Sequence, residues 1–373
     1  MANEDKATRY HRLRRRVSLL RTGAGAALLV LFIVSGASAG ARDFTANLAG
    51  GSVLLTVPMY VALMFLAAEL VELPLSYYLG VTLERRYGLS TQTLRSWWAD
   101  HLKAAAIGLA FTVGGAAIVT VIIRSSPEWW WLIAAAGFSA VIVVLAQLAP
   151  VLLLPLFYTL TPLDRPALRD RLLTLAERAG TRVLGVFELR LGDKTRKSNA
   201  ALTGIGRTRR ILLSDTLLAE LSDDEIEVIL AHELSHHVHH DIWRGIALEI
   251  ALMTLGFYLA DQALAATVGR FGIASKGDPA ALPILALAAG AVSFALMPLA
   301  NAVSRAHERR ADRYALEMTN NAPAFMSAMK RLGAQNLAEE RPSRLVQVLF
   351  YTHPPIAARI DAAQAWARRK RAP

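Results

Sequence analysis

Six apolar stretches constrain the fold of this chain more than any other feature of its sequence. Each is long enough to cross the hydrocarbon core of a bilayer as an α-helix, which needs about 20 residues. Because lipid offers no water to backbone groups, such stretches fold as helices that satisfy their own hydrogen bonds. The sequence therefore predicts a mainly α, polytopic membrane protein with about six transmembrane helices. They are expected at residues 19–39, 52–79, 104–123, 129–158, 246–268 and 281–300.

Lysine and arginine are unevenly distributed among the segments between these stretches. Residues 1–21, 80–103, 159–245 and 301–373 are rich in both, whereas 40–51, 124–128 and 269–280 are poor in them. Segments rich in these residues stay on the cytoplasmic side. We therefore expect both termini and the 159–245 segment in the cytoplasm. The net charge of +11 follows this distribution, so it does not indicate a nucleic-acid partner.

Two features of the first two stretches leave alternatives open. Residues 37–39 read Ala-Ser-Ala after a basic segment, as in a cleavable signal peptide, but the stretch is also long enough to span the membrane. Glu69 and Glu72 interrupt the second stretch. Such groups either face a wet cavity inside the helix bundle or lie near the cytoplasmic end and reach toward water.

The chain is expected to divide into four parts. Residues 1–158 form a membrane domain with four spans, 159–245 a cytoplasmic α/β insert, 246–305 two further spans, and 306–373 a basic, helical tail. Within the insert, the pattern predicts a helix over 165–179 and strands over 183–191 and 210–213. Residues 194–206, which contain glycine breaks, resemble an edge strand.

The insert ends in a motif with a specific chemistry. Ser222 with Glu225 three residues later forms a capping box, so a helix is expected from there. This helix carries His232, Glu233 and His236 in an H-E-x-x-H pattern. Histidines four apart lie on one face and can bind one zinc ion, with the glutamate beside a metal-bound water. The alternative is a histidine-rich helix face in contact with solvent.

A third zinc ligand is expected from the segment after the last span. Glu308 and Asp312 are four residues apart, so one carboxylate can bind zinc while the other accepts the free N–H of a zinc histidine. His307 is a chemically acceptable rival ligand. Helix geometry favours Glu308, because Asp312 lies four residues later on the same face. The residue four positions after His307 is Ala311, which cannot orient a ligand. The alternative is an ordinary charged helix beside the membrane. With no cysteine in the chain, thiolate sites and disulfides are excluded.

The motifs HELSH, SRAHERRAD and THPPIAARI, the last at residues 352–360, resemble those of the type 1 CAAX prenyl proteases. These are integral-membrane zinc metalloproteases, and this chain looks like a bacterial, inner-membrane member. The resemblance also covers residues 73–103, 150–163 and 197–218. Two departures are Ser235, where the family usually has glycine, and four expected spans before the insert, where the family generally has five.

The resemblance implies a role for each matching residue. His232, His236 and Glu308 would bind one Zn²⁺ per chain, Glu233 would be the general base, and Asp312 would orient a zinc histidine. Asn199 and Ala200 would lie on an edge strand that pairs with substrate backbone. His353 and Arg359 would reach the active site from the tail and stabilise the oxyanion. A large intramembrane chamber, also implied, would place Glu69 and Glu72 on a wet wall.

We therefore expect a membrane-embedded zinc metalloendopeptidase that cleaves membrane-associated or prenylated peptide substrates. One alternative is a quality-control protease for damaged membrane proteins, and an alternative from another class is a catalytically idle scaffold or chaperone. An intramembrane site-2 protease would place its H-E-x-x-H inside an apolar span, whereas residues 222–241 are strongly polar. An idle scaffold would have no need of Glu233.

Overall fold

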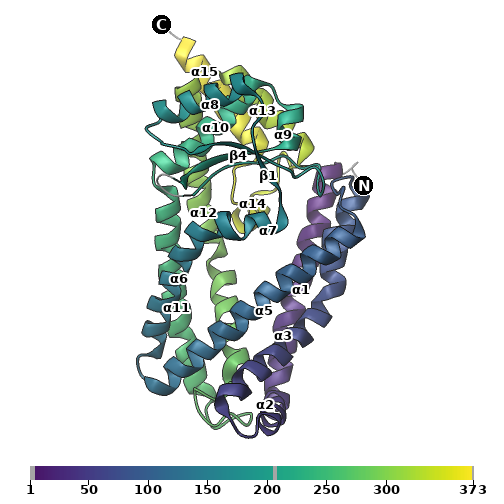
Figure 1. Ribbon diagram of the computed structural model, residues 1–373, viewed down its shortest axis with the longest axis vertical. Helices are drawn as coiled ribbons and strands as arrows, with labels where there is room; N and C mark the ends of the chain where they lie inside the picture. Colours follow the sequence, from purple (N-terminus) through teal and green to yellow (C-terminus); the bar gives the residue numbers. More distant parts are fainter. Residues whose placement is uncertain (1–4, 205–207, 372–373) are drawn as a thin grey trace.

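The computed structural model describes residues 5–204 and 208–371. Long helices form an elongated bundle, and a small α/β head with the C-terminal helices covers one end of it (Figure 1). Part of the predicted edge-strand stretch, residues 205–206, lies outside the described residues. The helical fold class with a small sheet is confirmed, and the described part of the chain contains six helices of membrane-spanning length and hydropathy.

The six candidate spans differ from the apolar stretches that predict them at their ends: most begin earlier or end later, whereas the fourth, Trp130–Leu152, is shorter than the predicted 129–158. They run Lys6–Val34, Val53–Arg86, Leu94–Ser125, Trp130–Leu152, Asp241–Thr267 and Pro279–Thr319. The first, third, fourth and fifth of these spans are the single helices α1, α5, α6 and α11. The second consists of α3 (Val53–Tyr77), the π-helix η1 (Tyr78–Leu83) and α4 (Glu84–Arg86), and the sixth of η3 (Pro279–Ala281) and α12 (Leu282–Thr319). The prediction of a loop over residues 80–103 was therefore wrong over much of its length, because polar helix ends carry no hydropathy signal.

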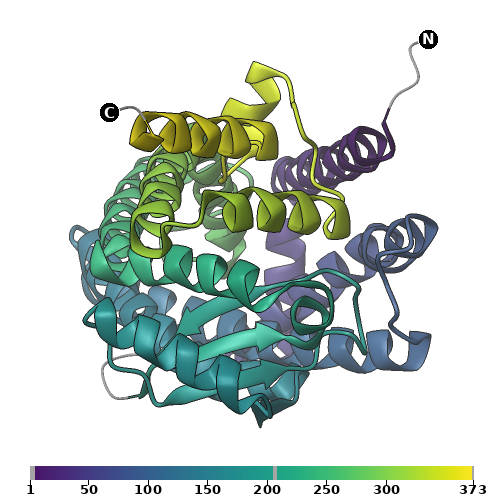
Figure 2. The same ribbon diagram turned by 90° about the horizontal axis from the view of Figure 1, so that it is seen from above.

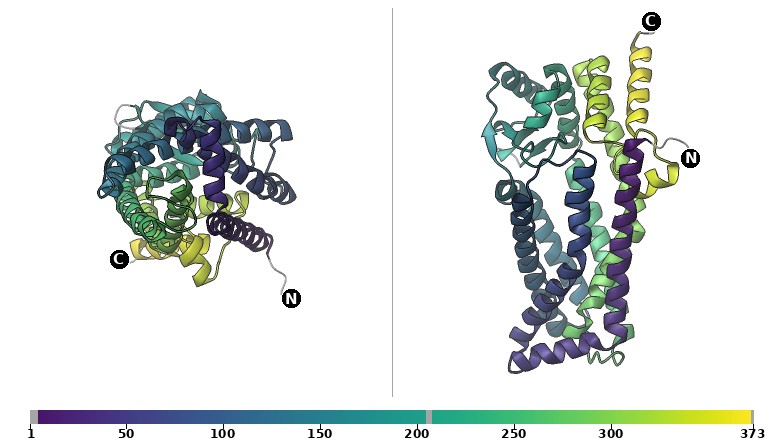
Figure 3. Two further views of the ribbon diagram at one scale, coloured as in Figure 1. Left: turned by 90° about the horizontal axis from the view of Figure 1, so that it is seen from below. Right: turned by 90° about the vertical axis from the view of Figure 1, so that its right-hand side faces the viewer.

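The segment predicted as an outer loop at 40–51 is also largely helical. Helix α2 (Ala37–Leu48) lies across the end of the bundle remote from the head (Figure 3). Twelve residues rise only about 18 Å, too little to cross a bilayer. Ser38, within the Ala-Ser-Ala pattern, is buried, and its Oγ lies 2.7 Å from both Tyr60 Oη and the carbonyl oxygen of Ala280. This pattern is thus part of the packed end of the bundle.

The two glutamates of the second span form ion pairs with neighbouring helices. Glu69 Oε1 lies 2.7 Å from Nε2 of His101 on α5. Glu72 Oε2 accepts a hydrogen bond of 2.9 Å from Nε of Arg21 on α1. Each carboxylate therefore has a basic partner within the helix bundle.

The head is built on a four-stranded mixed sheet. Its strands are β1 (Leu160–Pro162), β2 (Gly185–Leu189), β3 (Ala200–Thr203) and β4 (Arg210–Ser214), in the order β1-β2-β4-β3. β2 and β4 are parallel, and the two outer pairs are antiparallel. Strand β2 lies within the predicted range 183–191, and β4 covers the predicted range 210–213 and one further residue. Strand β1 was not predicted, because three residues ending in proline give little strand signal.

Helices cover one face of this sheet. They are α8 (Pro166–Arg178), close to the predicted 165–179, α9 (Asp215–Glu220) and α10 (Asp223–Val238). Their shared core includes Leu172, Ile211, Leu213, Ile226 and Phe325, all fully buried. Burying each such side chain stabilises the fold by about 1.5–3 kcal/mol. Seen from above, α10 lies between the sheet and α13 (Ala322–Gln335) (Figure 2).

The remaining helices connect the head to the bundle. Helix α7 (Leu154–Phe157) follows α6, and α14 (Arg344–Phe350) and α15 (Ile356–Arg371) end the chain. The sequence boundary proposed at 305/306 falls inside the continuous helix α12, and that at 245/246 falls inside α11. The helix that crosses the bundle therefore carries Glu308 and Asp312 directly into the head.

Candidate metal centre

Helix α10 carries the H-E-x-x-H motif, and its first turn is fixed by hydrogen bonds. The predicted capping box is present: the Ser222 N–H donates to Glu225 Oε2 at 2.7 Å, and Ser222 Oγ accepts from the Glu225 N–H at 3.4 Å. Glu225 is also 3.2 Å from Nε of Arg331 on α13. With its first turn fixed in this way, α10 holds His232 and His236 one above the other on the same face.

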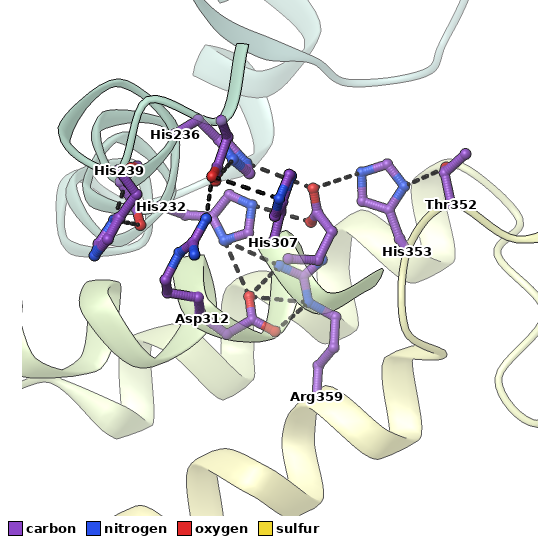
Figure 4. Close-up of polar contacts among 12 residues, drawn as sticks. His232, His236, His239, His307, Asp312, Thr352, His353 and Arg359 are labelled. Atoms are coloured by element: carbon purple, nitrogen blue, oxygen red, sulfur yellow. Dashed lines mark hydrogen bonds and ion pairs between the residues drawn. The ribbon is translucent and has the colours of Figure 1, made fainter. Parts of the chain in front are cut away.

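Helix α12 brings a carboxylate to these two histidines. Glu308 Oε2 lies 3.2 Å from Nε2 of His232, and Glu308 Oε1 lies 3.4 Å from Nε2 of His236. One ligand atom from each of the three residues lies within 4.8 Å of the others. Figure 4 shows the surrounding histidines and acidic groups converging on this point. The predicted set His232, His236 and Glu308 is therefore assembled in space.

The donor atoms fit a bound cation. Glu308 Oε2 is buried, and no described group donates a hydrogen bond of good geometry to it, although His232 Nε2 lies 3.2 Å away. Leaving a buried carboxylate oxygen without a donor is costly, and a cation at this point would satisfy it. Two imidazole nitrogens and one carboxylate are also the donor set of a catalytic metal site that keeps one position open.

Each histidine is oriented by a further carboxylate on its other ring nitrogen. His232 Nδ1 lies 3.0 Å from Asp312 Oδ1, and His236 Nδ1 lies 3.1 Å from Asp241 Oδ2. Both carboxylates are buried. A proton held on Nδ1 by these contacts leaves the Nε2 lone pair directed at the metal position. The predicted role of Asp312 thus has a geometric basis.

Asp241 was not predicted. It lies five residues after His236, outside the helix spacing that identified the other groups. His240 adopts a left-handed conformation with φ of 58°, and α11 begins at Asp241 directly after it. This turn brings Asp241 back toward His236. Asp241 also forms an ion pair with Arg310, and His307 Nε2 lies 3.8 Å from its Oδ1, so His307 contacts this carboxylate.

Glu233 lies beside the metal position in an environment that makes it a stronger base. Burial raises the pKa of its carboxyl above the usual value, because desolvation disfavours the charged form. Burial lowers the pKa of His232, but the carboxylates of Asp312 and Glu308 beside its ring outweigh this effect and raise that pKa to about 9. The two carboxylates therefore attract positive charge to the position that a metal ion would take.

The two tail residues predicted for the site, Arg359 and His353, both lie near the metal position but make different contacts. Arg359 on α15 donates from Nε to Asp312 Oδ2 at 2.9 Å, and its Nη2 lies 3.4 Å from His232 Nδ1. His353 Nε2 lies 3.4 Å from Glu308 Oε1, and its Nδ1 lies 2.8 Å from Thr352 Oγ1. Arg359 thus positions the carboxylate that orients His232, while His353 approaches the metal position from the open side (Figure 4).

A cavity of about 670 Å³ opens in front of these groups, and we call it the main cavity. Its walls include Glu233, His353 and Arg359, the edge-strand residues Asn199 and Ala200, and residues of α1. Its size is that of a site that encloses a small ligand or a short peptide segment.

Strand β3 presents free backbone groups beside the main cavity. The Asn199 carbonyl accepts from the Ser214 N–H at 2.9 Å, so Asn199 faces β4. In an antiparallel pair, successive residues alternate, so the N–H and C=O of Ala200 point away from β4. In the described sheet no strand lies on that side of β3. Asn199 and Ala200 thus lie where a peptide strand can be added.

Two family models match almost the whole chain. Residues 162–367 match peptidase family M48, and residues 2–159 match the N-terminal domain of CAAX prenyl proteases, which is described as having five membrane helices. The chain belongs to peptidase family M48. It is a membrane metalloprotease, and the resemblance inferred from its motifs is confirmed.

Relatives and a solved structure agree with this assignment. The chain is 34% identical to the uncharacterized metalloprotease YhfN of Bacillus subtilis, over 82% of the chain and 72% of the relative. It is 29% identical to CAAX prenyl protease 1 of Saccharomyces cerevisiae, over 84% and 73%. The fold matches the crystal structure of S. mikatae Ste24p with a TM-score of 0.86 at 24% identity, covering 96% and 88% of the two chains.

The departure from five helices in the N-terminal domain has a structural counterpart. This M48 peptidase has four candidate spans within the described residues 5–159, and α2 is an additional short helix there. Helix α2 is too short to cross a bilayer, so it does not add a fifth span. Ser235, the other departure, is fully buried, and its Oγ lies 3.0 Å from His239 Nδ1.

Helix α1 holds the segment that carries His353, a role that the sequence did not reveal. Arg15 Nη1 donates to Glu339 Oε2 at 2.7 Å, and the Tyr351 hydroxyl donates to the same oxygen at 2.6 Å. His11 Nε2 lies 2.8 Å from the Leu337 carbonyl oxygen. The arginines of residues 1–21 indicated topology in the sequence, but in this M48 peptidase Arg15 also positions one wall of the main cavity.

Asp241→Asn and Asp312→Asn should each weaken metal binding or turnover by about 10–100-fold, because an amide orients the imidazole less strongly than a carboxylate. Metal affinity by competition with a chelator and kcat on a peptide substrate measure the two effects. The matched control is Asp170→Asn, on an aspartate whose side chain is 67% exposed on α8. If Asp241→Asn keeps both its metal affinity and its turnover, Asp241 does not orient His236.

Proposed function

We propose that this M48 metalloprotease is a zinc endopeptidase that cleaves peptide bonds in membrane-associated substrates, including prenylated, CAAX-type ones. The observation that carries the proposal is the set of His232, His236 and Glu308, of which His236 is half-buried and the other two are buried. It lies beside Glu233, which lines the main cavity. Several relatives carry the name CAAX prenyl protease 1 or its homolog, which supports the prenylated class.

One Zn²⁺ per chain suits these donors, because zinc prefers tetrahedral sites of imidazole and carboxylate ligands. His232, His236 and Glu308 would hold it, with Asp312 and Asp241 fixing the imidazoles. When bound, zinc polarises the scissile carbonyl and lowers the pKa of a water molecule from about 16 to about 7.

The remaining residues handle protons, charge and substrate position. Glu233 takes a proton from the attacking water and passes it to the leaving amine, a role suited to its raised pKa. His353 lies on the open side of the metal position, where it can donate a hydrogen bond to the developing oxyanion. Arg359 supports that charge through Asp312 and His232.

Substrate backbone is proposed to pair with the free edge of β3, as in other peptide recognition by strand addition. Ala200→Pro should raise KM because it removes an edge N–H donor and fixes φ, while the metal content stays stoichiometric. The matched control is Ala200→Val, which keeps the donor. Steady-state kinetics and metal analysis check both variants, and an unchanged KM in Ala200→Pro would refute the edge-strand role.

The active site is proposed to face the cytoplasm. Helix α2 and the 269–280 loop lie together at the end remote from the head, where Arg42 Nη1 donates to the Gly272 carbonyl at 2.9 Å. The basic segments lie at the head end or within the head. Positive residues stay inside, so the head is cytoplasmic in a bacterial inner membrane.

This orientation can be tested by labelling, because the chain has no cysteine of its own. Asn47→Cys and Ser275→Cys should react with an impermeant maleimide added outside intact cells, whereas Thr174→Cys should react only after the cells are opened. All three positions are exposed. Labelling of Thr174→Cys from outside would reverse the orientation.

The substrate class is tested with matched peptides. Purified enzyme in nanodiscs is incubated with one CAAX-type sequence that is either prenylated on its cysteine or bare, and the cleaved bond is located by mass spectrometry. Faster cleavage of the prenylated peptide supports the CAAX-type reading. Equal cleavage of both, together with cleavage of unfolded membrane proteins, would favour the quality-control alternative.

A further inference from the structure

A second, apolar pocket lies beside the main cavity and has no role in the chemistry described so far. We call it the α6–α7 pocket, and its volume is about 410 Å³. Ala149 and Leu153 at the end of α6, with Leu154 and Phe157 of α7, form one side. The opposite side is Leu189, Ala201 and Leu212 from three neighbouring strands. Nearly all of its walls are therefore hydrocarbon.

The strand residues of this pocket share one face of the sheet. Ile211 and Leu213 of β4 and Leu202 of β3 point into the core beneath α8 and α10. Because side chains alternate along a strand, Leu212 and Ala201 point to the opposite face, toward α6 and α7. The α6–α7 pocket thus lies below the sheet, on the side away from α10.

The α6–α7 pocket and the main cavity meet at the free edge of β3. Asn199 and Ala200 line both of them. A peptide strand added at this edge would turn its side chains alternately toward α10 and toward the α6–α7 pocket. A side chain on the lower face near Ala200 would therefore enter the pocket while the backbone passes the main cavity, which Glu233 lines.

The far wall of the pocket is held in place by ionic and polar contacts. Lys194 Nζ donates to the Phe157 carbonyl and to Asp100 Oδ2, both at 2.5 Å. Lys103 Nζ donates to the Leu156 carbonyl at 3.1 Å. These contacts bind the last carbonyls of α7, a four-residue helix that could not hold its position alone. The pocket is therefore formed before a substrate arrives.

From these observations we infer that the α6–α7 pocket is a specificity subsite that binds one bulky apolar side chain of the substrate, next to the bond that is cut. The inference rests on the proposed function, because it needs a peptide strand at β3. None of the described residues that line the pocket carries a charge, so burial of hydrocarbon supplies the selectivity.

The test uses bare peptides that carry leucine or alanine at single positions on either side of the scissile bond. At one position the wild-type enzyme should prefer leucine by at least about tenfold in kcat/KM, the discrimination that an apolar pocket provides. Ala149→Phe fills the pocket and should reduce this leucine-to-alanine ratio at least about tenfold. Leu152→Phe is the matched control, because Leu152 is 58% exposed on the outside of α6 and lines neither cavity.

A second variant keeps the test decisive if Ala149→Phe fails to fold. Leu153→Ala enlarges the pocket and should shift the preference at the same position from leucine toward tryptophan. A wild-type enzyme without preference at any position, or ratios unchanged in both Ala149→Phe and Leu153→Ala, would overturn the subsite while the proposed peptidase function stands. Absence of cleavage of every peptide by the wild-type enzyme would instead contradict the proposed function.

Discussion

Replacing Glu308 by alanine should remove the bound zinc and abolish peptidase activity, whereas replacing its neighbour His307 should spare both. In the structure Glu308 has one oxygen near each metal-facing Nε2, at 3.2 and 3.4 Å. His307 has its Nε2 3.8 Å from Asp241 Oδ1 instead. Neighbouring helix residues project about 100° apart, so only one of the two can reach the metal.

The variants are purified in detergent and compared by metal analysis and by cleavage of one peptide. Glu317→Ala, on the same helix but outside the metal-binding group, is the control for removing an α12 carboxylate. His307→Ala should keep both zinc and activity, because Arg310 and His236 still hold Asp241 in place. Zinc retained in Glu308→Ala but lost in His307→Ala would reverse the ligand assignment.

Hydropathy predicted the number of spanning helices but not their ends. Apolar runs of about 20 residues in lipid favour a helix, so six helices were predicted, and residues 5–204 and 208–371 contain six. Their continuations carry charge, as in Lys6–Val34 and Val53–Arg86, and charge removes the hydropathy signal while the helix continues. Helix α2 was missed for the same reason, since its sequence is polar and lies between two apolar stretches.

For the candidate site, local spacing predicted what a helix brings together. His232 and His236 on α10, and Glu308 with Asp312 on α12, are pairs at i, i+4, and the structure places all four around one point. Asp241 reaches His236 only through the left-handed turn at His240, which no periodic pattern indicates.

Contacts between distant segments could not be predicted in the same way. The ion pair of Arg15 with Glu339 joins residues 324 apart in the sequence, and such a long-range, partly buried contact leaves no mark in either segment alone. Arg15 is therefore indistinguishable in the sequence from the arginines beside it. The α6–α7 pocket is hidden likewise, because its walls come from a membrane helix and three strands.

Glu233→Gln should keep stoichiometric zinc and lose turnover by about 10²–10⁴-fold, because the amide cannot accept the proton of the attacking water. The change keeps the shape of the side chain, and Glu233 is not among the three metal-binding residues. Metal content and peptide binding should therefore stay near those of the wild type. Single-turnover kinetics then isolate the chemical step from substrate capture.

The comparison with His232→Ala separates the base from the ligands. His232→Ala should lose most of the zinc and with it the activity, whereas Glu233→Gln should be inactive although loaded with metal. An idle scaffold would tolerate Glu233→Gln in any assay of its binding, and a protease that used another base would keep cleaving. If Glu233→Gln cleaves the peptide at the wild-type rate, a different group takes the proton, and His353, on the open side of Glu308, would become the first candidate to test.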